Sequence, residues 1–316
     1  MKCKICGNTE NNDHYQAKEM MLGYRDLHDY FQCASCQCLQ LETVPDNLPE
    51  YYPKDYYSYS DVGFPTGIKQ FLLARRDYYA ATGKSILGAI LSLANPEAKI
   101  ATLRPAKINK HSAILDVGCG AGHLLYSLKE AGFKQVQGAD PFNEADVEYK
   151  NNLKIIKQTI HEVEGNWDLI MFHHSFEHVE DQLEVLQSVA KRLNEGGTCL
   201  IRVPTVSSWA WKNYGTDWVQ LDAPRHLFLH SIKSMEYLAK QVDMKIDHVV
   251  YDSFAFQFWG SEQYKRDIAL HDEKSYAVSV AASPFTKNHI AGYEERSTKL
   301  NKENQGDQAC FYLSKA

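Results

Sequence analysis

Three glycines fall within five positions in the stretch ILDVGCGAGHLL, residues 114–125. Gly118, Gly120 and Gly122 would let the backbone approach a ligand closely and adopt a positive φ. A carboxylate, Asp116, stands two places ahead of the first glycine. The first turn from strand to helix is the usual ligand-binding place in an open α/β sheet. We therefore predict that this glycine loop binds a small molecule.

The main alternative ligand for this loop is a nicotinamide or flavin dinucleotide. Its fingerprint is G-x-G-x-x-G, with the pyrophosphate at a helix N-terminus. Here His123 stands at the third fingerprint position, and Asp116 would lie beside the pyrophosphate. A second carboxylate, Asp140, lies 20 residues past Gly120, where an acidic side chain can bind both ribose hydroxyls. The two carboxylates together favour S-adenosylmethionine, which is positively charged and has no phosphate.

Two pairs of cysteines near the start of the chain have the spacing of metal knuckles. Cys3 and Cys6 form the first C-x-x-C pair, and Cys33 and Cys36 form the second. Four thiolates arranged in this way most often hold one structural Zn²⁺ ion, with an iron–sulfur cluster as the weaker alternative. Cys38 is a candidate to replace Cys36. The first residues show no export signal, so we expect metal binding in a reducing compartment rather than disulfides.

A dense group of histidines follows the apolar run WDLIMF at residues 167–172. The next six residues, HHSFEH, include His173, His174 and His178, and histidine ionises near neutral pH. We predict that His178, or His226 in the later segment LDAPRHLF, is a general base. The alternative for His178 is a role in fixing the loop. His173 is expected to be partly buried with its nitrogens hydrogen-bonded.

The segment around His226 also has a purely structural interpretation. Asp222 and Arg225 could form a salt bridge that holds the loop, or Arg225 could pair with an acidic acceptor. Several aromatic residues also have two interpretations: they could contact an acceptor, or they could pack in the core. These residues are Trp209, Trp211, Tyr214, Trp218, Tyr51, Tyr52, Tyr56 and Tyr57.

From residue 112 onwards, segments typical of strands and helices alternate, which predicts a doubly wound α/β fold with a parallel sheet. Strands are expected at residues 112–118, 133–140, 153–160, 167–175, 198–204, 244–252 and 307–316. Helices are expected at residues 121–132, 143–152, 180–197 and 231–243, with helical pieces near 260–271 and 285–303. Residues 68–95 have the apolar spacing of one or two helices.

The chain divides into three predicted parts. Residues 1–44 form a small zinc-ribbon-like module, and residues 45–110 form a tyrosine-rich connector followed by helices. Residues 111–316 form the ligand-binding domain, in which residues 254–305 are an insertion or acceptor-side region. The chain carries a net charge of −6 and has no run of Lys and Arg, so nucleic acid is not the favoured partner. It also has no run of about 20 apolar residues that could span a membrane.

In the order and spacing of four motifs, the chain resembles class I S-adenosylmethionine-dependent methyltransferases. The motifs are ILDVGCGAGHLL, GAD, WDLIMFHHSFEHVED and LNEGGTCLIRVP. The resemblance implies a seven-stranded Rossmann-like sheet whose last strand is antiparallel beside the sixth. It also implies a set of residues that bind the cofactor: Asp116, Gly118, Cys119, Gly120, Gly122, Asp140, Pro141, Phe142, Ile160 and His174. Within this set, Asp116 and the glycines would hold the methionine part, Asp140 the ribose, and Phe142 and Ile160 the adenine.

The cysteine module and the segment LDAPRHLFLHS are similar to bacterial methyltransferases that modify sugars, polysaccharides or natural products. The C-terminal His-Gly-Gly signature of related sugar C-methyltransferases is absent. The resemblance implies a cytoplasmic enzyme that methylates a small molecule, with a hydroxyl as the first choice of acceptor. Two alternatives stay open: a macromolecular methyltransferase that docks RNA or protein through the zinc module, and a non-catalytic scaffold that binds the cofactor. The sequence does not predict the oligomeric state.

Overall fold

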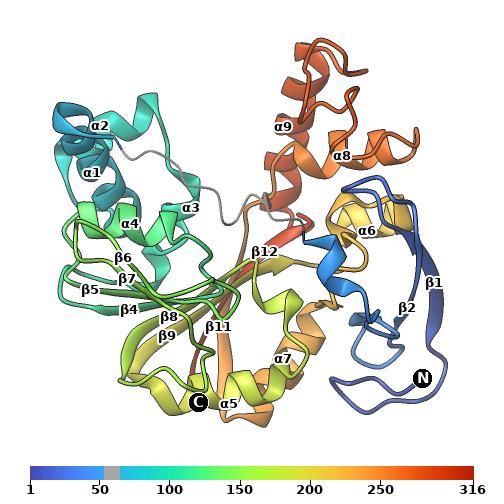
Figure 1. The fold of residues 1–316 in the computed structure, drawn as a ribbon, viewed down its shortest axis with the longest axis horizontal. Helices are drawn as coiled ribbons and strands as arrows, with labels where there is room; N and C mark the ends of the chain where they lie inside the picture. Colours follow the sequence, from blue (N-terminus) through green and yellow to red (C-terminus); the bar gives the residue numbers. More distant parts are fainter. Residues whose placement is uncertain (53–64) are drawn as a thin grey trace.

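A computed structural model describes residues 1–52 and 65–316 of the chain (Figure 1). Its strands are β1 Asp13–Lys18, β2 Leu27–Gln32, β3 Leu39–Leu41, β4 Ala113–Val117, β5 Gln135–Ala139, β6 Val147–Glu148, β7 Lys154–Ile156, β8 Trp167–His173, β9 Leu193–Pro204, β10 Phe228–Leu229, β11 Met244–Tyr251 and β12 Gln308–Lys315. Its α-helices are α1 Gly67–Thr82, α2 Ile86–Ala94, α3 Ala98–Ala101, α4 His123–Glu130, α5 Gln182–Arg192, α6 Trp209–Tyr214, α7 Ile232–Gln241, α8 Phe256–Tyr264 and α9 Lys287–Lys302. Short 3₁₀ turns are η1 Leu48–Tyr51, η3 Arg104–Ala106, η4 Phe176–His178, η5 Gly215–Asp217 and η6 Val219–Leu221.

The large sheet has the predicted doubly wound arrangement. Within the described residues its strand order is β11-β12-β9-β8-β4-β5-β7-β6. Strands β9, β8, β4, β5 and β7 are parallel to one another, and β12 pairs antiparallel with both β9 and β11. This confirms the predicted fold class and the antiparallel last strand beside the sixth. The eighth strand, β6, is a two-residue addition at the edge next to β7.

Side chains alternate across the sheet and separate its two cores. Along β8, Leu169 and Met171 belong to one buried cluster with α1 and α4, whereas Ile170 and Phe172 belong to another with α5 and α7. This alternation follows from the two-residue period of a strand. Figure 1 shows α1, α2 and α4 on one side of the sheet and α5 and α7 on the other. The central parallel strands therefore lie between two packed helical layers.

A second, four-stranded sheet joins the start of the chain to the middle of the large domain. Its order is β1-β2-β3-β10, and β3 pairs antiparallel with β10 at residues 228–229. The buried residues of β2 and β3 belong to the same cluster as α5 and α7. The cysteine-bearing segment thus packs directly beside His226. Independent folding of the three predicted parts stays a prediction.

Two predicted helical segments differ from the structure. The helix predicted over residues 143–152 is wrong, because this stretch holds β6 and turns. The side chains of Asn143 and Asp146 bond to the backbone of Gly120 and Lys157 instead of continuing a helix. The helix predicted over residues 180–197 ends at Arg192 as α5, and β9 starts at Leu193, which pairs with Trp167 of β8. In both places, sheet pairing outweighs the local helical pattern.

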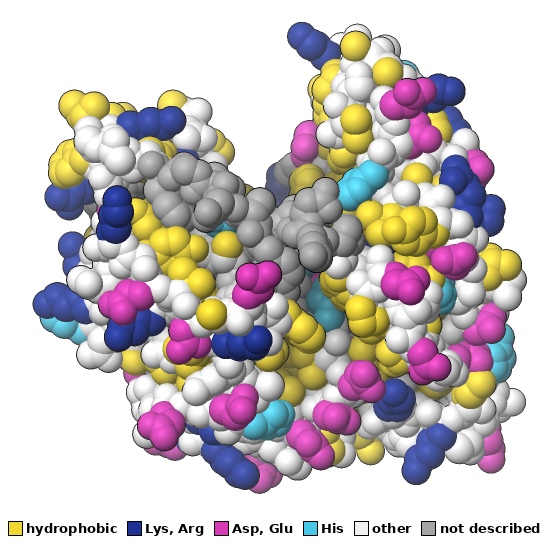
Figure 2. Space-filling model, in the orientation of Figure 1, with side chains coloured by type: hydrophobic (Ala, Val, Ile, Leu, Met, Phe, Trp, Pro, Cys, Tyr) yellow, Lys and Arg dark blue, Asp and Glu magenta, His cyan; other side chains and the backbone are white. Residues whose placement is uncertain are grey.

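The region between the small sheet and the large domain is described only in part. The predicted packing of Tyr56 and Tyr57 lies outside the described residues. The helices expected within residues 68–95 form as α1 and α2. Figure 2 shows hydrophobic side chains gathered over these two helices, whose exposed residues include Ile68, Ile86 and Leu93. None of the helices within residues 1–52 and 65–316 has the length and apolar character that crossing a membrane requires.

Candidate functional site

The glycine loop lies at the carboxyl end of β4 and leads into α4. Gly118, Gly120 and Gly122 all have positive φ, at 72°, 53° and 73°. A Cβ atom on Gly118 would lie 2.4 Å from Cβ of Ser175, so only glycine fits this close approach. Ser175 also donates a hydrogen bond of 2.6 Å to the carbonyl oxygen of Val117. The glycines therefore leave the backbone of the loop open to a ligand. The histidine segment that follows β8 lies directly against this loop.

Asp140, at the end of β5, fixes the shape of the loop. Its Oδ2 accepts a hydrogen bond of 2.8 Å from the backbone N–H of Gly120, and its Oδ1 accepts one of 2.9 Å from Phe142. Each carboxylate oxygen keeps a second lone pair for a ligand. Burial raises the pKa of Asp140 above its ordinary value. The predicted second carboxylate thus organises the loop, and its contact with a ribose stays a prediction.

Asp116 is buried, and its Oδ1 has no hydrogen-bond partner among the described residues. Burial, and to a lesser degree the charge of Asp140, raise the pKa of Asp116 well above its ordinary value. A buried carboxylate without a partner is costly unless a ligand satisfies it. A positively charged group bound at the loop would remove this cost, whereas a pyrophosphate would increase it.

Two further residues support the loop, and no local sequence pattern marks either of them. Asn143 donates from Nδ2 to the carbonyl oxygen of Gly120 over 3.2 Å. The hydroxyl of Tyr149 donates to the carbonyl oxygen of Ala121 over 2.6 Å. Both come from the segment that forms turns instead of the predicted helix. Their roles depend on a tertiary contact between two βα connections, which no local pattern encodes.

The other predicted cofactor residues lie around this loop with different exposure. Phe142 is 80% exposed, whereas Ile160 is 2% exposed within the core. Pro141 follows Asp140 directly, and Cys119 is partly buried between the glycines. Phe142 is therefore open to a ligand, but Ile160 presents little surface to one. Contact of these residues with an adenine stays a prediction.

The structure brings His178 and His226 together, although 47 residues separate them. Their ring centroids lie 4.9 Å apart. His178 belongs to η4, and its Nδ1 lies 2.8 Å from the carbonyl oxygen of Arg225. Nδ1 of His226 lies 2.8 Å from the carbonyl oxygen of Gln220. Because a carbonyl can only accept, Nδ1 of each histidine carries a proton, so each ring in its neutral form presents a bare Nε2.

Glu177 lies beside these two rings and is completely buried. Neither of its carboxylate oxygens has a hydrogen-bond partner among the described residues. Its Oε1 lies 3.8 Å from Nε2 of His226 and 3.4 Å from Nδ1 of His174. Burial opposes the charge of Glu177, but the three surrounding histidines outweigh burial and hold its pKa at about 2. The sequence places Glu177 in the histidine loop but assigns it no role.

The remaining histidines of this loop have separate environments. Nε2 of His174 accepts a hydrogen bond of 2.7 Å from Arg202, so its Nδ1 carries the proton and faces Glu177. His174 therefore contacts protein groups, and its predicted contact with the cofactor stays a prediction. His173 is partly buried as expected, but both its ring nitrogens lack a hydrogen-bond partner in the described part of the chain. The expectation that these nitrogens are hydrogen-bonded is wrong.

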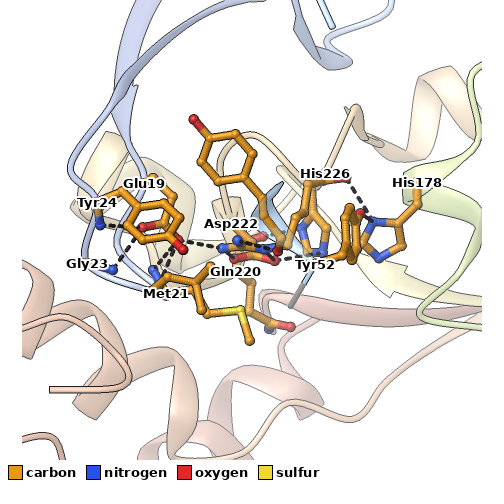
Figure 3. Close-up of polar contacts among 12 residues, drawn as sticks. Glu19, Met21, Gly23, Tyr24, Tyr52, His178, Gln220, Asp222 and His226 are labelled. Carbon is orange, nitrogen blue, oxygen red and sulfur yellow. Dashed lines mark hydrogen bonds and ion pairs between the residues drawn. The ribbon is translucent and has the colours of Figure 1, made fainter. Parts of the chain in front are cut away.

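Arg225 holds the loop before His226 and is completely buried. Figure 3 shows its two carboxylate partners, Glu19 and Asp222, near His226. Its guanidinium donates to Asp222 over 2.6 and 3.0 Å and to Glu19 over 3.0 Å. Glu19 in turn accepts hydrogen bonds from four backbone N–H groups of the turn that follows it, those of Met21, Leu22, Gly23 and Tyr24. The salt-bridge interpretation of Asp222 and Arg225 is thus confirmed, and Arg225 is not available to an acidic acceptor. Glu19, which completes the pair, has no recognisable signal in the sequence.

The tryptophans before this loop are mainly structural. Trp218 is completely buried and donates from Nε1 to Asp307 over 2.9 Å. Trp211 is also buried and donates to Gln32. Trp209 packs under the guanidinium of Arg296, 4.0 Å from the ring centroid. These contacts favour the interpretation of the tryptophans as a core patch.

The four predicted cysteines converge on one point. The sulfur atoms of Cys3, Cys6, Cys33 and Cys36 all lie within 4.8 Å of one another. The Sγ atoms of Cys3 and Cys36 are 3.6 Å apart, and those of Cys6 and Cys33 are 3.5 Å apart. These distances exceed a disulfide bond of about 2 Å but match thiolates about 2.3 Å from a shared tetrahedral ion. The arrangement can therefore hold one metal ion.

The two cysteine knuckles have the same backbone geometry, which explains why Cys38 is outside the cluster. The N–H groups of Gly7 and Gln37 donate to the carbonyl oxygens of Cys3 and Cys33, and both residues have positive φ. In the second knuckle, Cys38 supplies the carbonyl that accepts from the N–H of Cys33. Its buried thiol points to the carbonyl oxygen of Leu39 instead. Cys38 is thus not needed as a ligand.

The cysteine cluster is attached to the segment that carries His226. The hydroxyl of Ser231 donates to the carbonyl oxygen of Cys36 over 2.5 Å, and the hydroxyl of Tyr30 donates to that of His226 over 2.9 Å. The side-chain amide of Gln40 donates to Sγ of Cys3 over 2.9 Å. Together with the pairing of β3 and β10, these bonds fix residues 226–231 to the cysteine module.

Comparison with known proteins identifies the domain that holds the loop. Residues 93–249 match a family described as a methyltransferase domain. The ubiquinone biosynthesis O-methyltransferase of Erwinia tasmaniensis is 29% identical over 132 residues, which cover 38% of this chain and 54% of that protein. The chain thus matches about half the length of this curated relative.

Solved structures with a similar course of the chain are also methyltransferases or related enzymes. The plantazolicin methyltransferase BpumL, in complex with a monoazolic desmethylPZN analog and SAH, has a TM-score of 0.40 and 16% identity, covering 78% of this chain and 84% of that chain. The cyclopropane synthase MmaA2 from Mycobacterium tuberculosis has a TM-score of 0.44 and 14% identity, covering 79% and 99%. Residues 93–249 thus match a methyltransferase domain, and the observed strand order is the doubly wound one that the sequence predicts.

Proposed function

We propose that this methyltransferase-domain chain transfers a methyl group from S-adenosylmethionine to a hydroxyl of a small molecule, such as a sugar-containing or secondary-metabolite intermediate. The observation that carries the proposal is the buried pair Asp116 and Asp140 at the glycine loop. One of the two has an oxygen without a partner, and burial raises the pKa of both. A cationic ligand without phosphate satisfies such a pair, and S-adenosylmethionine is that kind of ligand.

Each part of the cofactor has residues that would hold it. Asp140 would accept hydrogen bonds from the ribose, since each of its oxygens keeps a free lone pair. Asp116 and the loop glycines would hold the methionine part, and the exposed ring of Phe142 would cover the adenine. Cys119, Pro141, Ile160 and His174 would complete the wall of the site. When bound, the cofactor supplies an electrophilic methyl group.

The residues His178, His226 and Glu177 form the acceptor side of the proposed site. Ser175 ties this cluster to the glycine loop, so that it lies close to the proposed donor. Methyl transfer requires an aligned nucleophile, and a hydroxyl must also lose its proton. The bare Nε2 atoms of the two histidines can receive that proton, because each Nδ1 is already protonated and held by a carbonyl. Oxygen as the acceptor atom is supported by the similarity to the O-methyltransferase of Erwinia tasmaniensis.

The cysteine cluster is proposed to hold one structural Zn²⁺ ion. Four thiolates close the coordination sphere, which is typical of structural rather than catalytic zinc. The N–H···S bond from Gln40 to Cys3 is the kind of outer-shell contact that stabilises a thiolate ligand. The ion would keep residues 226–231 in place from outside the reaction site.

Replacement of either histidine by alanine is expected to lower turnover while leaving the affinity for S-adenosylmethionine nearly unchanged. Loss of a group that handles the proton typically costs 10²–10⁴-fold, so we expect a fall of about 100-fold or more for His178→Ala and His226→Ala. The assay supplies S-adenosylmethionine with a radiolabelled methyl group and a panel of glycosides, sugar nucleotides and phenols. His271→Ala, at an exposed histidine outside the cluster, is the control. Normal turnover in both variants would show that the assignment is wrong.

A further inference from the structure

Glu177, His178 and His226 bring three possible metal-ligand atoms close together. One possible ligand atom from each residue lies within 4.8 Å of the other two. The fixed tautomers of both histidines make each Nε2 a lone-pair donor, and the Glu177 carboxylate is completely buried with no hydrogen-bond partner among the described residues. Three possible ligand atoms therefore lie close together around a buried carboxylate, which is unfavourable unless a cation lies among them.

The distances favour a metal ion rather than a shared proton. Nε2 of His226 and Oε1 of Glu177 are 3.8 Å apart, which is too long for an N–H···O hydrogen bond. Two atoms that each lie about 2.1 Å from one metal ion are about 3 to 4 Å apart. Two imidazoles and one carboxylate are also a common protein ligand set for divalent transition metals.

The surrounding contacts are those that metal-binding histidines require. Each ligand histidine donates from its other nitrogen to a backbone carbonyl, of Arg225 for His178 and of Gln220 for His226. Such outer-shell bonds fix the ring and its tautomer for coordination. His174 directs its protonated Nδ1 toward Glu177 over 3.4 Å and so supports the carboxylate. Asp222 Oδ2 also lies 3.8 Å from Nε2 of His226, but each oxygen of Asp222 already accepts a hydrogen bond from Arg225.

We infer that Glu177, His178 and His226 bind a divalent transition-metal cation, which activates the hydroxyl acceptor of the methyl transfer. Three protein ligands leave coordination positions for that hydroxyl, and a bound cation lowers the pKa of an oxygen it contacts. The hydroxyl gives its proton to water, and the freed electron pair forms the bond to the methyl carbon. The carbon–sulfur bond breaks in the same displacement, and its electron pair stays on sulfur to leave S-adenosylhomocysteine. With the cation bound, the two histidines act as its ligands. The cation, instead of a histidine base, then activates the hydroxyl.

Binding of Mn²⁺ to the full chain tests the site directly, because Mn²⁺ prefers nitrogen and oxygen ligands to the four thiolates of the cysteine cluster. The chain is first loaded with one equivalent of Zn²⁺, and free Mn²⁺ is then followed by electron paramagnetic resonance. We expect one Mn²⁺ per chain in the unmodified protein and in the exposed-histidine control His271→Ala. Glu177→Gln keeps the shape of the side chain, and we expect it and His226→Ala to weaken binding by more than about 100-fold, beyond the loss typical of outer-shell changes.

Circular dichroism of each variant shows whether it is folded, and Glu177→Gln remains informative if His226→Ala does not fold. Absence of Mn²⁺ binding in the unmodified chain, or equal binding in folded Glu177→Gln, would overturn the inference. The role of the cation rests on the proposed function, but its binding does not. If methyl transfer continues unchanged after chelation and the chain binds no Mn²⁺, the metal site is wrong but the proposed function stands. Binding of Mn²⁺ by a chain that does not bind S-adenosylmethionine would defeat the proposed function alone.

Discussion

Replacing Asp140 with alanine is expected to lower the affinity for S-adenosylmethionine by at least about 100-fold. The carboxylate would lose its bonds to the ribose, and hydrogen bonds to a charged group contribute about 1.5–3 kcal/mol each. The substitution also removes the acceptor for the N–H of Gly120, so the loop loses the tether that holds its shape. Isothermal titration calorimetry of the full chain measures the change.

The matched control for this prediction is Glu144→Ala, which removes an exposed acid from the same connection, four residues further along. Its side chain has no hydrogen bond to the loop, so we expect an affinity within about twofold of the unmodified chain. Thermal unfolding of both variants separates loss of the site from loss of the fold. An Asp140→Ala variant that is folded and binds the cofactor normally would show that the carboxylate does not hold the ribose.

Replacing Cys33 with serine is expected to release the metal ion and to loosen the first 44 residues. Structural zinc sites stabilise small modules by about 10 kcal/mol or more, because the site forms only in the folded state. Residues 226–231 depend on this module through Ser231, Tyr30 and β10. We therefore expect methyl transfer to fall by at least about 10-fold through misplacement of His226, while cofactor affinity changes little. Zinc content and limited proteolysis measure the two structural effects.

Cys38→Ser is the matched control, because it changes a buried thiol of the same module that lies outside the cluster. A serine hydroxyl can donate to the carbonyl oxygen of Leu39 as the Cys38 thiol does. This variant should keep its zinc and its resistance to protease. If Cys33→Ser also keeps the metal, or if Cys38→Ser loses it, the ligand set given by the four converging sulfur atoms is incorrect.

Local sequence patterns predicted those residues whose placement depends on one turn, strand or helix. Spacing alone located the four cysteines, because each C-x-x-C pair forms its knuckle within a few residues. The glycine loop and Asp140 were predictable for a similar reason, since the ends of neighbouring parallel strands meet at one edge of the sheet. The order of the main strands followed from the motifs and the family resemblance.

Contacts between distant parts of the chain were not predictable in this way. Glu19 binds Arg225 across 206 residues, and no periodic pattern in the sequence marks either partner. Asn143 was assigned to a helix, because its tertiary bond to Gly120 leaves no trace in local propensity. The role of Glu177 depends on the tautomers of His178 and His226, which are set by carbonyl groups from another loop. These features require the folded arrangement.

The central claim is that the glycine loop binds an adenosyl sulfonium and not a dinucleotide. Calorimetric titration of the full chain with S-adenosylmethionine, and separately with NADH, tests it most directly. The two buried carboxylates and His123 at the third fingerprint position predict saturable binding of one S-adenosylmethionine per chain and no binding of NADH. Binding of NADH, or absence of binding by S-adenosylmethionine, would contradict the account.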